Sequence, residues 1–243
     1  EGKILSELPD KLLNKVDDKF RSPQGELVGI SSRSKVVVYN TKTIDPNKDL
    51  PQSIMDFTDP KWKGRIGWAP THGEWQITPM AIRIEKGEDA ARSWLEGVKA
   101  NQPRVYPNLI SIVHAAGQGE IDVGFVNHYY VPRFIQEEGS GFGARNHYLG
   151  KGDPGAVIDV AAVGVIKSTE NKSRAEGFVE YMLGTEAQTY FSEQTHEYPL
   201  IADVKPSGDL RPLESLDPPD INPAELSQLE ATLKMLRDAG IIP

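Results

Sequence analysis

The chain has 243 residues, of which 38% are hydrophobic, and a formal net charge of −8 at pH 7. This composition excludes a globally disordered chain, and no apolar run approaches the roughly 20 residues that a membrane-spanning helix needs. The acidic balance argues against nucleic acid and anionic lipid as main partners. Because cysteine is absent, disulfides, thiolate metal sites and thiol nucleophiles are excluded as well.

Patterns typical of strands and helices alternate along the chain. In chain order they predict a short helix or helical turns over 6–20, a strand over 26–41, a helix and turn over 53–64, a strand over 65–70, helices over 73–87 and 88–101, a strand over 104–108, a helix over 110–119, a strand over 121–127, a helix over 129–139, a strand over 155–168, and helices over 173–184, 185–195 and 223–240. Asn222 is expected to cap the last helix, Pro223 to begin it and Gly240 to end it. The alternation predicts an α/β fold with mostly parallel sheets.

Two strand patterns, "VGISSRSKVVVYN" and "VIDVAAVGVIKS", are longer than the usual strand of about 5–6 residues. Such lengths are expected if each strand crosses from one lobe of the protein into another. We therefore predict a discontinuous first lobe, residues 1–31 plus 161–243, and a second lobe, residues 32–160. In open α/β sheets ligands bind outside the carboxyl ends of strands, so a cleft between the lobes is the expected binding place.

One strand end carries two adjacent tyrosines, Tyr129 and Tyr130, in "VNHYYVPRF". If the pair begins a helix, the two side chains diverge by roughly 100°, so both oxygens can reach one ion. A highly charged cation lowers the pKa of a phenol, and phenolate is a hard ligand that suits ferric iron. The alternative is one core ring beside one rim ring. His128 is expected to point away from such a site, into packing or to the surface.

The segments "SSRSKVVVYNT", "DPKWKGRIGWAPTHG", "GQGEIDVGFVNHYYVPRF" and "GDPGAVIDVAAVGVIKS" together closely resemble the periplasmic ferric-iron-binding proteins of bacterial ABC importers. The resemblance runs from about residue 4 to the C-terminus. It implies the two-lobed type II periplasmic binding fold, with one Fe(III) held in the cleft by Tyr129 and Tyr130 together with carbonate or phosphate. It also implies that Asn127 helps to hold that anion.

Further candidate anion-binding residues are Arg33, His72, Gly73 and Glu74. A guanidinium suits bidentate binding of carbonate or phosphate, although Arg33 can instead form a surface or interlobe salt bridge. The "THGEW" segment stands where the family offers backbone N–H groups at a helix start, and Gly73 would allow close approach. Glu74 departs from the small residue or tyrosine expected there. It is an iron ligand, a partner of Arg33, or a solvated charge favoured by the helix dipole.

The resemblance further implies a binding protein rather than an enzyme, monomeric and not membrane-spanning, which delivers iron to an ABC permease. Its expected location is periplasmic or extracellular, with tethering to the cell surface as an option. Relatives begin with a further α/β portion, so an N-terminally truncated chain with an incomplete first lobe is expected. The alternatives are an anion, polyamine or thiamine carrier without metal, and a hydrolase that uses Glu74 and His72 as acid and base.

Overall fold

The computed structural model describes residues 4–208, 210–221, 225–226 and 228–243. The chain forms two compact units. Unit 1 comprises Glu1–Arg33 and Asp159–Ser215, and unit 2 comprises Ser34–Ile158 and Leu216–Pro243. Within the described ranges no helix has the length and apolar character needed to cross a bilayer.

The chain passes between the units within two strands and once more after Ser215. The first passage lies inside β2 (Val28–Asn40) and the second at the start of β7 (Ile158–Val163), which pairs with β2. The third passage was not expected, and it assigns residues 216–243 to unit 2 instead of the first lobe. The reason is packing, because α8 (Leu229–Asp238) contacts α2 and buries Met235 and Leu236 in the unit 2 core.

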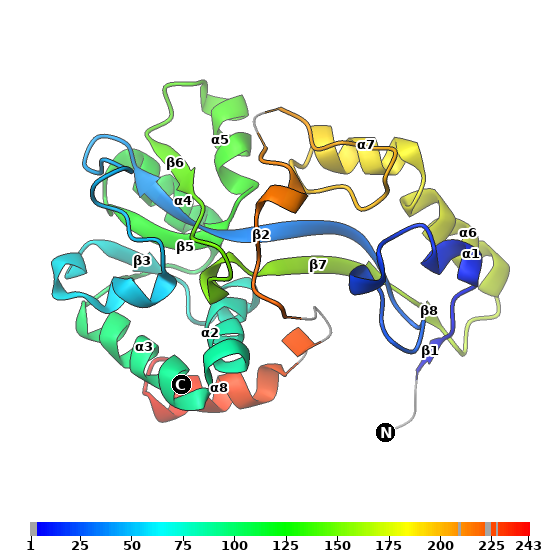
Figure 1. The fold of residues 1–243 in the computed structure, drawn as a ribbon, viewed down its shortest axis with the longest axis horizontal. Helices are drawn as coiled ribbons and strands as arrows, with labels where there is room; N and C mark the ends of the chain where they lie inside the picture. The colour runs from blue at the N-terminus through cyan, green and yellow to red at the C-terminus, as the bar shows by residue number, and fades with distance from the viewer. Residues whose placement is uncertain (1–3, 209, 222–224, 227) are drawn as a thin grey trace. The chain divides into compact units, whose positions relative to one another are not determined.

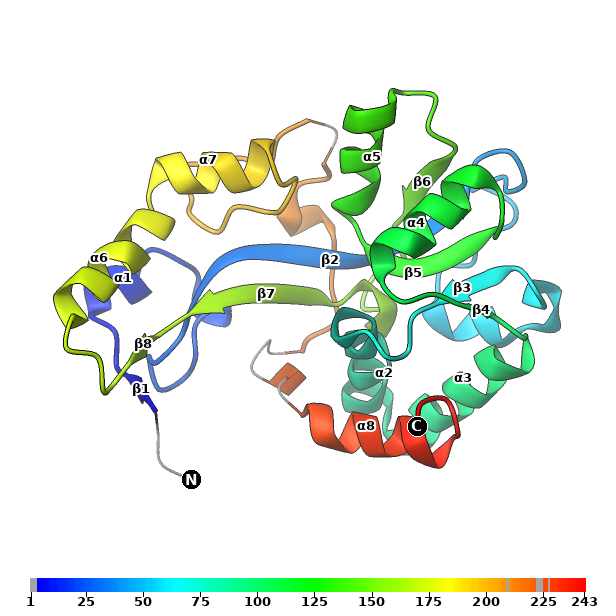
Figure 2. The same ribbon diagram turned by 180° about the vertical axis from the view of Figure 1, so that it is seen from behind.

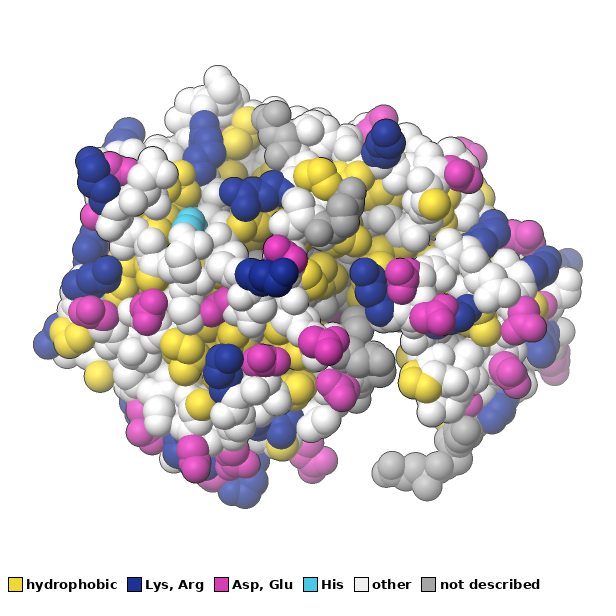
Figure 3. Space-filling model, viewed as in Figure 1, with side chains coloured by type: hydrophobic (Ala, Val, Ile, Leu, Met, Phe, Trp, Pro, Cys, Tyr) yellow, Lys and Arg dark blue, Asp and Glu magenta, His cyan; other side chains and the backbone are white. Residues whose placement is uncertain are grey.

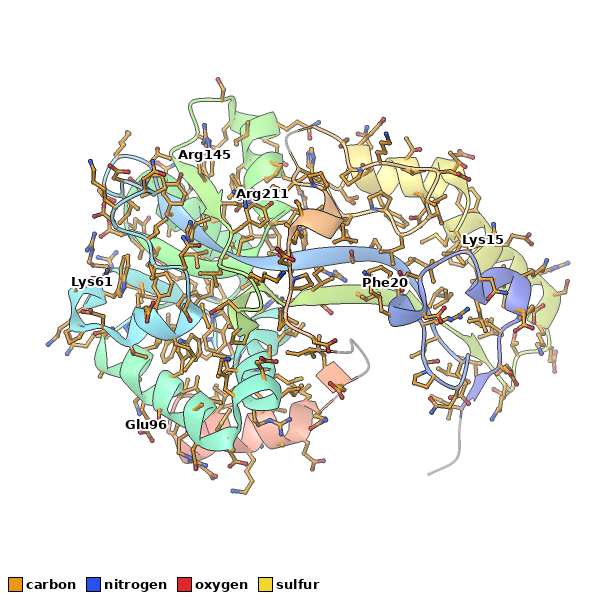
Figure 4. All side chains as sticks on the ribbon, in the orientation of Figure 1. Lys15, Phe20, Lys61, Glu96, Arg145 and Arg211 are labelled. Atoms are coloured by element: carbon orange, nitrogen blue, oxygen red, sulfur yellow. The ribbon has the colours of Figure 1, made fainter. Side chains whose placement is uncertain are left out.

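Unit 1 contains short strands and two consecutive helices. Its elements, besides parts of β2 and β7, are β1 (Leu5–Ser6), α1 (Asp10–Leu13), η1 (Asp18–Phe20), β8 (Val165–Ile166), α6 (Lys172–Met182), α7 (Thr185–Glu193) and η5 (Leu213–Ser215). β1 and β8 form an antiparallel pair. Phe20, labelled in Figure 4, is 7% exposed and belongs to the buried side chains of this unit.

Unit 2 is built around a mixed sheet in the order β4-β3-β5-β2-β6. Its elements are η2 (Ile54–Thr58), η3 (Pro60–Trp62), β3 (Ile66–Trp68), α2 (Gly73–Lys86), α3 (Glu88–Ala100), β4 (Arg104–Val105), α4 (Leu109–Gln118), β5 (Val123–Asn127), α5 (Tyr130–Glu138), β6 (Ala144–His147), η4 (Pro154–Ala156) and α8. Helices α4 and α5 lie on one side of the sheet, and α2, α3 and α8 lie on the other (Figures 1 and 2).

The sheet directions differ from the expectation of mostly parallel strands. β3 runs parallel to β4 and β5, but β2 runs antiparallel to both β5 and β6. The long strand β2 inserts between two later strands, so the sheet is half antiparallel around it. The helix and turn expected over 53–64 form the two 3₁₀ helices η2 and η3. Asn222 and Pro223, the expected start of the last helix, lie outside the described residues.

An aromatic cluster fills the core of unit 2 beside the sheet. Trp75 meets Trp68 edge-on, with ring centroids 5.7 Å apart, and stacks near Trp94 at 6.2 Å. Trp94 also packs against Phe125 of β5 and donates a hydrogen bond of 2.8 Å from its indole N–H to the Ile54 carbonyl. All four tryptophans of the chain are in this core. They hold the first turn of α2, where Trp75 lies, against the end of the sheet.

The surface of unit 2 carries both signs of charge. In the view of Figure 3, lysine, arginine, aspartate and glutamate side chains alternate over the visible face and form no single-sign field. Lys61 and Glu96, both exposed, lie at the periphery of this unit in Figure 4. The acidic excess is therefore spread over solvated positions on this face.

Candidate functional site

The tyrosine pair lies where β5 ends and α5 begins. Asn127 is the last residue of β5, Tyr129 is the N-cap of α5 with helical backbone angles (φ −72°, ψ −15°), and Tyr130 is the first helical residue. The chain has therefore left strand geometry before the pair. The two rings lie side by side, with centroids 4.3 Å apart and planes inclined by 43°. Tyr129 is half-buried and Tyr130 is 9% exposed.

The environment of Tyr130 favours the neutral phenol. Burial raises its pKa well above the ordinary value, and the hydrogen bond with Tyr129 and the negative charge of Glu74 raise it further, against a lowering by Arg133. Desolvation and a nearby carboxylate both disfavour the phenolate.

A buried lysine, Lys35, joins two of the candidate residues. Its side chain is 3% exposed, and its ammonium donates hydrogen bonds to the Asn127 Oδ1 atom at 2.6 Å, the Glu74 carbonyl at 2.7 Å and the Glu74 Oε2 atom at 3.2 Å. The Asn127 Nδ2 atom donates to the same Glu74 Oε2 atom at 3.1 Å. Since lysine only donates, the amide oxygen must face Lys35, which turns the amide NH₂ group towards the carboxylate.

Local structure explains this triangle. Lys35 and Asn127 are directly opposite in the antiparallel pairing of β2 and β5, so their side chains lie on the same face of the sheet. Glu74 is in the first turn of α2, where the helix dipole favours a negative charge. The sequence analysis missed Lys35. The available signal was a lysine next to the apolar run "VVVY" of a buried strand, because lysine is almost never buried without a partner.

The other predicted anion-binding residues are placed as follows. Arg33 belongs to unit 1, where its Nε atom lies 3.4 Å from the Asp159 carboxylate. His72 is the N-cap of α2 without a side-chain cap bond, and its buried Nδ1 atom finds no hydrogen-bond acceptor or donor among the described residues. Gly73 is exposed at the start of α2, with open space around the position of a Cβ atom. Anion binding by these three residues stays a prediction.

His128 packs against the sheet. It is fully buried. Its ring Nδ1 atom accepts a hydrogen bond of 3.2 Å from the Ser34 backbone N–H, and its backbone N–H donates to the Ser34 carbonyl at 3.0 Å. Its ring meets Tyr129 edge-on at 5.9 Å. The histidine thus ties the turn before the tyrosine pair to β2.

The chemistry available on unit 2 is that of hard oxygen donors. Two phenols and one carboxylate lie near one another, beside an ammonium and an amide. In the part of the chain that the structure describes, no three His, Cys, Asp or Glu side chains are grouped to hold a metal ion. A cation at this place would therefore depend on the tyrosines, and such a donor set suits a hard ion.

Sequence comparison relates the chain to solute-binding proteins. Residues 2–219 match the family described as bacterial extracellular solute-binding protein. The major ferric iron-binding protein of Neisseria meningitidis is 34% identical over 241 residues, which are 98% of this chain and 72% of that protein. The Fe(3+)-binding periplasmic protein of Serratia marcescens is 28% identical over 99% of this chain and 71% of its own length.

Solved structures share the fold. Iron-bound HitA of Pseudomonas aeruginosa matches with a TM-score of 0.92 at 36% identity, over 98% of this chain and 76% of that chain. The Trichodesmium protein IdiA (FutA), in complex with iron and citrate, matches with a TM-score of 0.87 at 26% identity, over 98% and 78% of the two chains. The expected α/β class, that of type II periplasmic binding proteins, is confirmed by these matches.

Proposed function

Because the chain belongs to the bacterial extracellular solute-binding protein family, we propose that it binds ferric iron through Tyr129 and Tyr130 for delivery to an ABC importer. The observation that carries this proposal is the pair of adjacent phenol rings, 4.3 Å apart, at the junction of β5 and α5. The names of the relatives from Neisseria and Serratia support ferric iron as the cargo.

Ferric iron offsets the cost of ionising the two phenols. A neutral phenol is a weak ligand, and the buried, carboxylate-flanked Tyr130 resists ionisation more than a free tyrosine does. A trivalent cation stabilises both phenolates strongly. The interaction of phenolate with a singly charged cation is too weak to displace the phenol protons. The site therefore favours a small, highly charged ion over common monovalent cations.

An anionic group completes the site in this proposal. Asn127, with the His72–Glu74 segment at the start of α2, forms its anion-holding part, for which the resemblance to the family implies carbonate or phosphate. Arg33, whose Nε atom pairs with Asp159, is the further residue proposed to bind the anion, because a guanidinium suits bidentate binding of carbonate or phosphate.

The proposed cellular role follows from the family. The protein takes up iron as a monomer in the periplasm or outside the cell, either free or tethered to the cell surface, and passes it to a membrane permease. It has no catalytic step of its own. Membership of a solute-binding family leaves the hydrolase alternative, with Glu74 and His72 as acid and base, without support.

Visible spectroscopy tests the proposal. Ferric iron added to the metal-free wild type should produce a phenolate-to-iron charge-transfer band, one ion per chain. The band should be lost in Tyr129→Phe/Tyr130→Phe and kept in Tyr181→Phe, an exposed tyrosine of unit 1. A folded wild type that stays colourless with a full range of added anions contradicts iron binding. Native mass spectrometry would then identify a bound anion, polyamine or thiamine as the alternative cargo.

A further inference from the structure

We propose that the Glu74 carboxylate is itself the anionic partner of the iron site, so that ferric iron is bound without exogenous carbonate or phosphate. This inference rests on the proposed function and concerns the same site. It starts from the donors that would hold a free anion. Two side-chain donors on unit 2, the Lys35 ammonium and the Asn127 amide NH₂ group, both donate to the Glu74 Oε2 atom, at 3.2 and 3.1 Å.

The holding groups are fixed before any ligand arrives. Lys35 is 97% buried and is positioned by the Asn127 Oδ1 atom and the Glu74 carbonyl as well as by the carboxylate. The strand register that sets Lys35 opposite Asn127 keeps both donors on one face. The side chain that they hold is 31% exposed, so solvent and an arriving ion can reach it.

A free anion would have to displace this carboxylate. Carbonate or phosphate bound by Lys35 and Asn127 would lie beside the negative charge of the displaced Glu74 carboxylate. The two like charges would repel each other. Such an anion would also leave Glu74 without its ammonium partner. The internal carboxylate needs no such displacement, and it loses no translational freedom on iron binding because it belongs to the chain.

The charges of the proposed donor set balance. Two phenolates and one carboxylate carry three negative charges, which match those of Fe(III). Asn127, which donates to the Glu74 Oε2 atom at 3.1 Å, ends β5 two residues before Tyr129, so the carboxylate is held beside the turn that carries the tyrosine pair. Lys35 and Asn127 then act as positioning residues, which orient the carboxylate without touching the metal.

The first test measures anion dependence. Metal-free protein is loaded with ferrous chloride that is oxidised by carbon dioxide-free air, in buffer without bicarbonate or phosphate. The wild type should reach the full charge-transfer band, and added bicarbonate or phosphate should change it little. Glu74→Ala should lose most of the band and regain it with either anion, because the truncation empties the place between the donors. Glu74→Gln should lose the band without regaining it, because its side chain still fills that place.

The second test uses metal-free protein and inorganic phosphate alone. Calorimetric titration should show binding to Glu74→Ala at least about tenfold tighter than to the wild type, a difference of about 1.4 kcal/mol. Glu85→Ala, on the exposed side of the same helix, is the matched control and should behave as the wild type.

Each outcome bears on one of the two proposals. A wild type that needs bicarbonate or phosphate for its band, or a Glu74→Ala protein that keeps the band without them, overturns the built-in anion but leaves iron binding intact. Equal phosphate affinity of wild type and Glu74→Ala also overturns it. A wild type that gives no band under any condition refutes the proposed function itself. The wild-type measurement stands even if a variant fails to fold.

Discussion

Replacing the buried lysine tests the energetics of the site directly. In Lys35→Met the aliphatic stem stays buried, but three acceptors lose their ammonium: the Asn127 Oδ1 atom, the Glu74 carbonyl and the Glu74 carboxylate. Removing one partner of a fully buried ion pair costs about 3–5 kcal/mol. Because the Glu74 side chain is 31% exposed, water replaces part of the lost interaction. We therefore expect the free energy of unfolding of the variant to be about 2–3 kcal/mol lower than that of the wild type.

Tryptophan fluorescence during urea denaturation is the appropriate assay, because all four tryptophans belong to unit 2. With a urea dependence of about 2–3 kcal/mol per molar, the midpoint should fall by about 1 M. Lys63→Met, at an exposed position of the same unit, is the matched control and should shift by less than about 0.5 kcal/mol. If Lys35→Met unfolds at the same urea concentration as this control, the buried network does not stabilise unit 2 as reasoned here.

Three further changes have defined outcomes. A Cβ atom at Gly124 would lie 2.2 Å from the buried Ile112 Cγ2 atom, so Gly124→Ala should destabilise unit 2 by about 1–3 kcal/mol. Gly141→Ala is the control, because a Cβ atom there meets open space, and it should leave stability unchanged. Equal urea midpoints for the two variants would refute the packing argument. His128→Leu should lower the free energy of unfolding by about 1–3 kcal/mol, because the Ser34 N–H loses its acceptor, and should leave the iron band unchanged. Loss of the band would instead indicate that the histidine is a ligand. Burial raises the pKa of Tyr39, so the folded protein favours the neutral phenol. The free energy of unfolding should therefore fall as pH rises above the pKa of an unfolded tyrosine, near 10. An equally steep fall in Tyr39→Phe would contradict this.

Much of the fold is readable from the sequence because local patterns decide it. The periodic segments of α2 and α3 end at Gly87 and Asn101, near the predicted boundaries. The length of "VGISSRSKVVVYN" predicted a strand that continues from one unit into the other, and β2 contains such a passage. The tyrosine pair was expected at a strand end that opens a helix, and α5 begins there.

The remaining features depend on contacts between distant segments. The burial of Lys35 depends on partners 39 and 92 residues away, and the local pattern, a lysine beside an apolar strand run, does not identify those partners. The packing of α8 on α2 likewise joins segments far apart in the chain, and it places residues 216–243 in unit 2. The 3₁₀ helices η2 and η3 have a local cause instead, because capping by Ser53 and Asp59 interrupts the expected helix.

The role of Glu74 shows the same limit at the site. The sequence left it as an iron ligand, a partner of Arg33 or a solvated charge. Its hydrogen bonds with Lys35 and Asn127 show that it is more than a solvated helix-start charge. These two partners were not foreseen, because finding them requires knowing which strand lies beside the start of α2, and strand order is not encoded in the periodicity of either segment.

Resonance Raman spectroscopy of iron-loaded protein tests the central claim most directly, because excitation within the charge-transfer band enhances only the vibrations of groups bound to the metal. We predict tyrosinate ring modes in the wild type, reduced in each of Tyr129→Phe and Tyr130→Phe and absent from the double variant. A protein that holds one ferric ion per chain but shows no tyrosinate modes would contradict the assignment of the paired tyrosines as ligands.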